Sequence, residues 1–153
     1  MPPSGFFLDT NLFVLFVVGS VGRDLIEKHK RLQTYSAEDY EILIDLLDRV
    51  ERVYVTPNTL TETSNLLSQH GEPERSRFFQ KLRFIIQQSK EVTVASVKAS
   101  SNSAFNRLGL TDAALLEAVS PETPLVTVDL DLYLAANASV QEAALNFTHY
   151  RNL

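Results

Sequence analysis

Phe6-Phe7-Leu8-Asp9-Thr10-Asn11-Leu12-Phe13 is the stretch of the chain that decides its fold, because an acidic residue, followed by Thr10 and Asn11, interrupts an apolar run. An apolar run of this kind is typical of a strand that is buried on both faces of a sheet. The strand is expected to end at Asp9, which places a carboxylate at the carboxyl edge of the sheet. A buried carboxylate without a partner is costly, so a specific role is expected for Asp9.

The length and composition of the chain indicate one domain over residues 1–153. A chain of this length can bury roughly two thirds of the surface that its unfolded form exposes. Cysteine is absent, which excludes disulfides, thiolate zinc sites and a thiol nucleophile, and favours a reducing cytoplasm. The apolar run over residues 12–18 is too short to span a bilayer, so no membrane contact is expected.

The net charge of −5 gives no general attraction for a polyanion. Two local basic clusters, at residues 28–31 and residues 75–83, are the exceptions. The first interpretation of both is a solvated helix surface, and contact with phosphates is the alternative. A nucleic acid would have to approach along one of these two clusters.

Strand-like and helix-like segments alternate along the rest of the chain. Strands are predicted at residues 6–9, 52–56, 91–95, 125–128 and 144–148. A first helix is predicted to be capped by Thr10 or Asn11, and a second to span residues 24–32. Further helices are predicted to follow Ser36 and Pro57, to run through residues 78–89 and to end at Gly109. The last two are predicted to be capped by Thr111 and to follow Asp129. This alternation predicts a three-layer α/β/α domain with a mostly parallel central sheet.

Four acidic residues are expected at one edge of this sheet. Sites in parallel α/β proteins form outside the carboxyl ends of the strands, where Asp9 and Asp129 are predicted to lie. Glu62 and Asp112 fall in the first turns of helices that can lie beside the same edge. Four carboxylates this close would repel one another unless a cation neutralised them, and Mg²⁺ or Mn²⁺ suits oxygen ligands.

Each acid also has an ordinary explanation. Asp112 follows Thr111 at a predicted helix start and could simply cap that helix. Glu62 could be a solvated glutamate, and the Asp129-Leu130-Asp131 pair could arise by chance in an acidic chain. The joint pattern therefore carries more weight than any single member.

The order of these motifs resembles that of the PIN-domain family, the small metal-dependent nucleases that include the toxins of VapBC toxin–antitoxin pairs. The resemblance covers nearly the whole chain. It is carried by Phe7-Leu8-Asp9-Thr10-Asn11, Thr59-Leu60-Thr61-Glu62-Thr63, Leu108-Gly109-Leu110-Thr111-Asp112-Ala113-Ala114-Leu115 and Leu125-Val126-Thr127-Val128-Asp129-Leu130-Asp131-Leu132.

The resemblance implies a Mg²⁺- or Mn²⁺-dependent ribonuclease that cleaves single-stranded RNA with activated water, leaving a 5′-phosphate and a 3′-hydroxyl. It assigns the catalytic and metal-binding quartet to Asp9, Glu62, Asp112 and Asp129. It assigns supporting positions to Thr10, Asn11, Thr127 and Asp131. RNA as substrate, an antitoxin protein as partner and pairing as a homodimer are further implications of the same resemblance.

Three alternatives to this interpretation remain. A PIN-like module without activity could bind RNA or protein, although retention of all four acids favours the active enzyme. Asp129-Leu130-Asp131 also suggests a haloacid-dehalogenase-type phosphatase, but too few residues follow Asp131 to build the rest of that sheet. An RNase H-like nuclease also uses clustered acids, but its antiparallel start is not predicted here.

Overall fold

The computed structural model describes residues 2–151 and contains a five-stranded parallel sheet in the order β3-β2-β1-β4-β5. The strands are β1 (Gly5–Leu8), β2 (Arg52–Val55), β3 (Lys90–Glu91), β4 (Leu125–Thr127) and β5 (Ala144–Asn146). From β1 the chain adds β2 and β3 on one side and then returns to add β4 and β5 on the other. The strand order therefore reverses between β1 and β4, the place where α/β sheets form their ligand sites.

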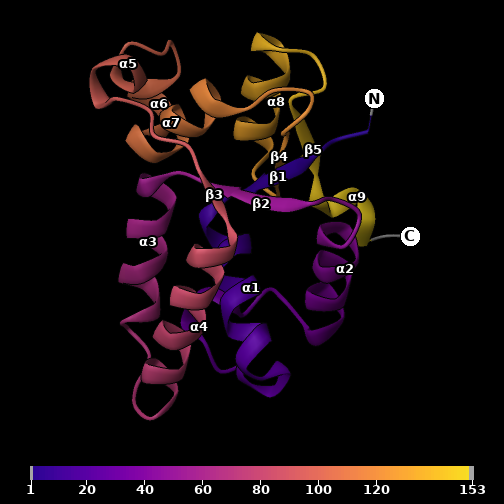
Figure 1. Cartoon of the computed structure of the whole chain (residues 1–153), viewed down its shortest axis with the longest axis vertical. Helices are drawn as coiled ribbons and strands as arrows, with labels where there is room; N and C mark the ends of the chain where they lie inside the picture. Colours follow the sequence, from indigo (N-terminus) through magenta and orange to yellow (C-terminus); the bar gives the residue numbers. More distant parts are fainter. Residues whose placement is uncertain (1, 152–153) are drawn as a thin grey trace.

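Helices cover both faces of the sheet, which confirms the predicted three-layer α/β/α architecture (Figure 1). In the described part of the chain they are α1 (Thr10–Val21), α2 (Ala37–Leu47), α3 (Pro57–Leu67), α4 (Glu74–Gln88), α5 (Ser96–Ser100), α6 (Phe105–Leu108), α7 (Leu110–Ala118), α8 (Leu130–Ser139) and α9 (Phe147–Arg151). Helices α1 to α4 lie on one side of the sheet and α5 to α8 on the other, while α9 packs beside α2.

The central strand β1 shows why the opening run is apolar throughout. Phe6 and Leu8 belong to the core shared with α1, whereas Phe7 belongs to the core shared with α7 and α8. Successive side chains of a strand point to opposite faces, so a strand covered on both faces needs apolar residues at every position. All four residues of β1 are buried, as the sequence predicted.

The helix predicted over residues 24–32 is wrong. The segment forms two short 3₁₀ turns, Arg23–Leu25 and Lys30–Leu32, which pack against α1. His29 is buried between them, and its Nδ1 accepts a hydrogen bond from the Arg31 amide. That bond starts the second turn and ends any continuous helix.

Two predictions between β2 and α7 also need correction. The strand expected over residues 91–95 is reduced to the two residues of β3, after which the chain leaves the sheet for α5. The single helix expected to end at Gly109 is divided into α5 and α6, because the Asn102 side chain accepts the Ala104 amide and donates to Glu117. Gly109 does end α6, with a φ of 89° that favours glycine.

The helices predicted after Ser36, Pro57 and Asp129 are present as α2, α3 and α8, and the helix predicted through residues 78–89 corresponds to α4. The strand expected over residues 144–148 ends at Asn146, because Phe147 and Thr148 belong to α9. Ser36 and Asp39 form a reciprocal capping box at the start of α2, and Pro57 occupies the first turn of α3. None of the helices within residues 2–151 has both the length and the apolar character that crossing a membrane requires.

Candidate active site

The four predicted acids line one pocket at the point where the strand order reverses. β1 and β4 pair directly through Leu8 and Val126, so the residues that follow these strands emerge side by side. Asp9 directly follows β1, and Asp129 follows β4 after one intervening residue. Helices α3 and α7 add Glu62 and Asp112. The pocket has a volume of about 180 Å³, and its other lining residues are Thr10, Asn11, Arg31, Leu66, Val128 and Leu132.

Asp9 is buried, with 7% of its surface exposed, and its carboxylate is held from three directions. Oδ1 accepts the Leu12 amide at 2.9 Å, which makes Asp9 the N-cap of α1 in place of the predicted Thr10 or Asn11. Oδ2 accepts the Thr127 hydroxyl at 2.5 Å and the Val128 amide at 3.2 Å. Burial nevertheless raises the pKa of Asp9, because these hydrogen bonds do not fully replace the lost hydration.

Glu62 is exposed, yet two hydroxyl groups fix both of its oxygens. Thr10 of α1 donates to Oε1 at 3.1 Å, and Thr111 of α7 donates to Oε2 at 2.6 Å. Thr111 therefore does not cap α7 as predicted, since Gly109 precedes that helix and Thr111 lies inside it. The three helices α1, α3 and α7 meet at the Glu62 carboxylate.

Asp112 lies in the first turn of α7 and is half-buried. Within residues 2–151 its carboxylate accepts no hydrogen bond from any protein donor. Burial, followed by the negative charges of the other three acids, raises the pKa of Asp112 to about 7. Since Gly109 occupies the N-cap position, the capping explanation for Asp112 is wrong. The Asp112 carboxylate is a strongly perturbed ionisable group in a cleft, which is a recognised mark of a functional site.

Asp129 is the N-cap of α8, because its Oδ1 accepts the Leu132 amide at 3.1 Å. The amide of Asp129 donates to the Thr127 hydroxyl at 3.0 Å, so Thr127 links the Asp9 carboxylate to the Asp129 backbone. Asn11 is exposed and lines the pocket. Asp131 is exposed on the first turn of α8 and lies outside the pocket lining, so the structure does not bring it together with the four acids.

The pocket has the donor chemistry that a hard divalent cation requires, namely carboxylate oxygens and several negative charges in one place. Within residues 2–151, however, no three carboxylate or imidazole groups converge closely enough to form a ready-made metal-binding group. Three of the four carboxylates, those of Asp9, Glu62 and Asp129, accept hydrogen bonds from protein donors. The residues fit such an ion in charge and ligand type.

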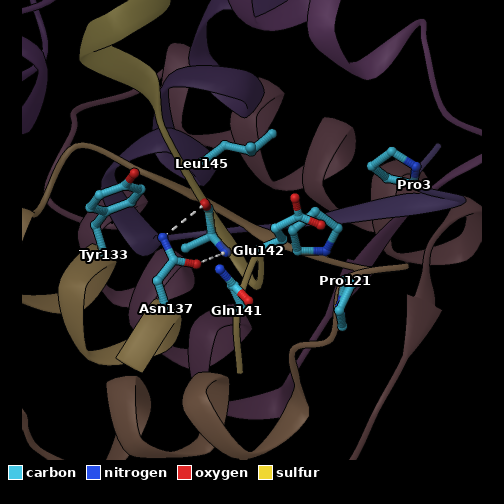
Figure 2. A pocket seen from close by; sticks show the side chains of 9 residues that line it. Pro3, Pro121, Tyr133, Asn137, Gln141, Glu142 and Leu145 are labelled. Carbon is cyan, nitrogen blue, oxygen red and sulfur yellow. Dashed lines mark hydrogen bonds between the residues drawn. The ribbon is translucent and has the colours of Figure 1, made fainter. Parts of the chain in front are cut away.

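A larger pocket, of about 550 Å³, lies near the amino ends of β1, β4 and β5 (Figure 2). Among the residues that line this pocket, Glu142 alone carries a carboxylate. The Asn137 side chain, which also lines the pocket, is hydrogen-bonded to the backbone of Ala144. Asn137 accepts the Ala144 amide at 2.9 Å and donates to the Ala144 carbonyl at 3.3 Å. This pocket lacks clustered charges, so the smaller acidic pocket is the candidate active site.

Arg31 is the charged residue of the pocket lining that the sequence did not identify as part of the site. It was predicted to lie on a solvated basic helix, and the structure places it in the lining of the acidic pocket. Its position depends on the burial of His29, which no local pattern reveals.

No protein-family model matches the chain, and no curated protein matches its sequence. The class that the structure itself defines is a three-layer α/β/α domain with an acidic pocket at the switch point of a parallel sheet.

Proposed function

We propose that the protein is a Mg²⁺- or Mn²⁺-dependent endoribonuclease that hydrolyses phosphodiester bonds in single-stranded RNA at the acidic pocket. The observation that carries the proposal is that four acidic residues from separate parts of the chain line one pocket at the switch point of the sheet. The resemblance of the four motifs to the PIN-domain family supports the same activity and supplies the choice of RNA.

In this proposal Asp9, Glu62, Asp112 and Asp129 would hold the metal, and the surrounding residues would orient them. A bound divalent ion would lower the pKa of a coordinated water and stabilise the charge on the phosphate and on the leaving oxygen. Asp9 keeps its orientation through three hydrogen bonds, and Glu62 keeps its orientation through two hydroxyl groups. Such outer contacts limit the motion of a metal ligand and sharpen its geometry.

A role as the toxin of a toxin–antitoxin pair is the finer form of this proposal. An antitoxin partner and a homodimeric toxin belong to that finer form, and both rest on the resemblance alone.

The test is cleavage of an end-labelled single-stranded RNA by the purified protein with Mg²⁺, Mn²⁺ or EDTA. We expect cleavage only with a divalent ion, and products that carry a 5′-phosphate and a 3′-hydroxyl. Asp9→Asn and Asp112→Asn are expected to lower the rate at least about 100-fold, because each removes a metal ligand. Asp131→Asn is the matched control, since Asp131 lies outside the pocket, and it is expected to keep wild-type activity.

Equal cleavage by wild type, Asp9→Asn and Asp112→Asn would contradict the proposal, because it would point to a contaminating nuclease. Binding of the RNA without cleavage by any divalent ion would favour the inactive binding module instead.

A further inference from the structure

A third pocket, of about 240 Å³, is lined by the same two segments of chain as the acidic pocket. It is lined by Lys28, His29, Lys30, Gln69, His70 and Gly71. Residues 28–31 reach both pockets, because Arg31 lines the acidic one. The end of α3 also reaches both, since Leu66 lines the acidic pocket and His70 lines the basic one. A basic pocket and an acidic pocket are therefore neighbours along the surface.

Arg31 is held at the acidic pocket by its backbone. The Arg31 amide donates to Nδ1 of His29 at 3.2 Å, and His29 is 1% exposed. The His29 ring stacks on His70 with a centroid separation of 5.4 Å and meets the edge of Phe78 at 6.2 Å. The backbone of Arg31 is therefore fixed to a packed aromatic cluster, while its side chain is exposed.

The Arg31 guanidinium makes no ion pair within residues 2–151, although four carboxylates share its pocket. An arginine that is not committed to a protein carboxylate keeps its planar set of donors for an incoming anion. That set matches the oxygens of a phosphate group. A polyanionic substrate also needs a local cation here, because the chain as a whole has a net charge of −5.

The other basic cluster, at residues 75–83 of α4, has two of its cationic side chains placed over aromatic rings of the same helix. The Arg75 guanidinium lies 4.8 Å above the Phe79 ring, and the Lys81 ammonium lies 5.6 Å above the Phe84 ring. Arg83 lines a separate groove that α3 and α4 form. Among the described residues of α4, none lines the acidic pocket. Of the two basic clusters, residues 28–31 are thus the one that reaches the site.

We propose that residues 28–31 form a phosphate-binding strip through which the sugar–phosphate backbone of a single-stranded nucleic acid enters the acidic pocket. Arg31 contacts the phosphate that lies at the four acids, and Lys28 and Lys30 contact the next phosphate along the strand. Contacts of this kind go to the backbone, so the strip positions the substrate without reading its bases. The assignment rests on the proposed nuclease function and adds the path of the substrate to it.

The first arm of the test measures steady-state cleavage of a short single-stranded RNA by wild type, Arg31→Ala, Arg31→Lys and Arg83→Ala. Arg83→Ala is the matched control, because it removes an exposed arginine of α4 that lies outside the acidic pocket. We expect Arg31→Ala to lower kcat/KM about 10- to 100-fold, the loss that follows from removing a charged hydrogen bond. Arg31→Lys should recover part of the loss, since lysine keeps the charge without the planar donor set.

The second arm measures binding of a fluorescein-labelled single-stranded RNA by anisotropy between about 50 and 200 mM salt. Each phosphate contact adds about 0.7 to the salt slope for a single strand, so Arg31→Ala and Lys30→Ala should each lower the slope by about 0.7. Arg83→Ala should leave the slope unchanged. A single-base homopolymer series should show the same effect for every base.

The two proposals fail in different ways. If wild type cleaves RNA but Arg31→Ala matches Arg83→Ala in both kcat/KM and salt slope, the strip is overturned and the nuclease stands. The same holds if Arg31→Ala changes only the stability of the protein, because Arg31 would then be a counter-ion of the acids. If wild type does not cleave RNA while the salt slopes behave as predicted, the nuclease is overturned and the strip stands.

Discussion

Replacing Asp112 by asparagine is expected to stabilise the metal-free protein at neutral pH, although it should abolish activity. Burial and the neighbouring acids raise the pKa of Asp112 from 3.8 to about 7. Between these two pH values the unfolded chain ionises at Asp112 while the folded chain stays largely protonated. The folded state therefore loses stability as the pH rises from about 4 to about 7, and the full cost is present above about pH 7.

The pKa values set the size of this effect. The shift in the pKa of Asp112 corresponds to a loss of at most about 4 kcal/mol in the free energy of unfolding, at about 1.4 kcal/mol for each pKa unit. Asp112 is only half-buried, so solvent screening reduces the expected gain to about 1 to 2 kcal/mol. Asparagine has nearly the same shape and carries no charge, so it removes this cost without opening a cavity.

The assay is urea unfolding of wild type and Asp112→Asn in EDTA at about pH 5 and about pH 8. The gain in the free energy of unfolding should be largest at about pH 8 and less than half as large at about pH 5. Asp131→Asn serves as the control, since it removes an exposed acid outside the pocket and should cost no more than about 0.5 kcal/mol. Equal or lower stability of Asp112→Asn at about pH 8 would refute the electrostatic argument.

Two further predictions concern hydrogen bonds that hold the site and the sheet. Thr127→Val removes the hydroxyl that donates to the buried Asp9 carboxylate, so the free energy of unfolding at about pH 8 should fall by about 2 to 3 kcal/mol. Thr127→Ser should retain most of that free energy in the same urea titration, and equal losses in both variants would show that the hydroxyl is not the cause. Asn137→Ala should lower the free energy of unfolding by about 1 to 3 kcal/mol, because the amide and carbonyl of Ala144 lose their partner at the edge strand. Amide hydrogen exchange at Ala144 checks this, and unchanged protection there would contradict it.

The parts of the fold that follow local patterns could be predicted from the sequence. β1 and β4 are short apolar runs, and the acids that follow them must emerge together once the strands pair. The layers follow from the alternation of strands and helices. These features depend on the spacing of apolar residues and on the burial of whole segments. Both can be read from the amino-acid sequence of one chain.

The parts that depend on contacts between distant residues could not be predicted. Glu62 is oriented by hydroxyl groups that lie 52 and 49 residues away in the sequence, and nothing near it shows that the three residues meet. Residues 24–32 have a helical composition, but the burial of His29 and its bond to Arg31 break the helix into short turns. The position of Arg31 in the acidic pocket follows from that same burial.

Calorimetric titration of Mn²⁺ into the metal-free protein tests most directly whether the acidic pocket is a divalent metal centre. We predict that wild type and Asp131→Asn bind Mn²⁺ with equal affinity, and that Asp112→Asn binds it at least about 10-fold more weakly. Absence of Mn²⁺ binding by wild type, or equal binding by Asp112→Asn, would contradict the assignment of these four carboxylates as a metal site.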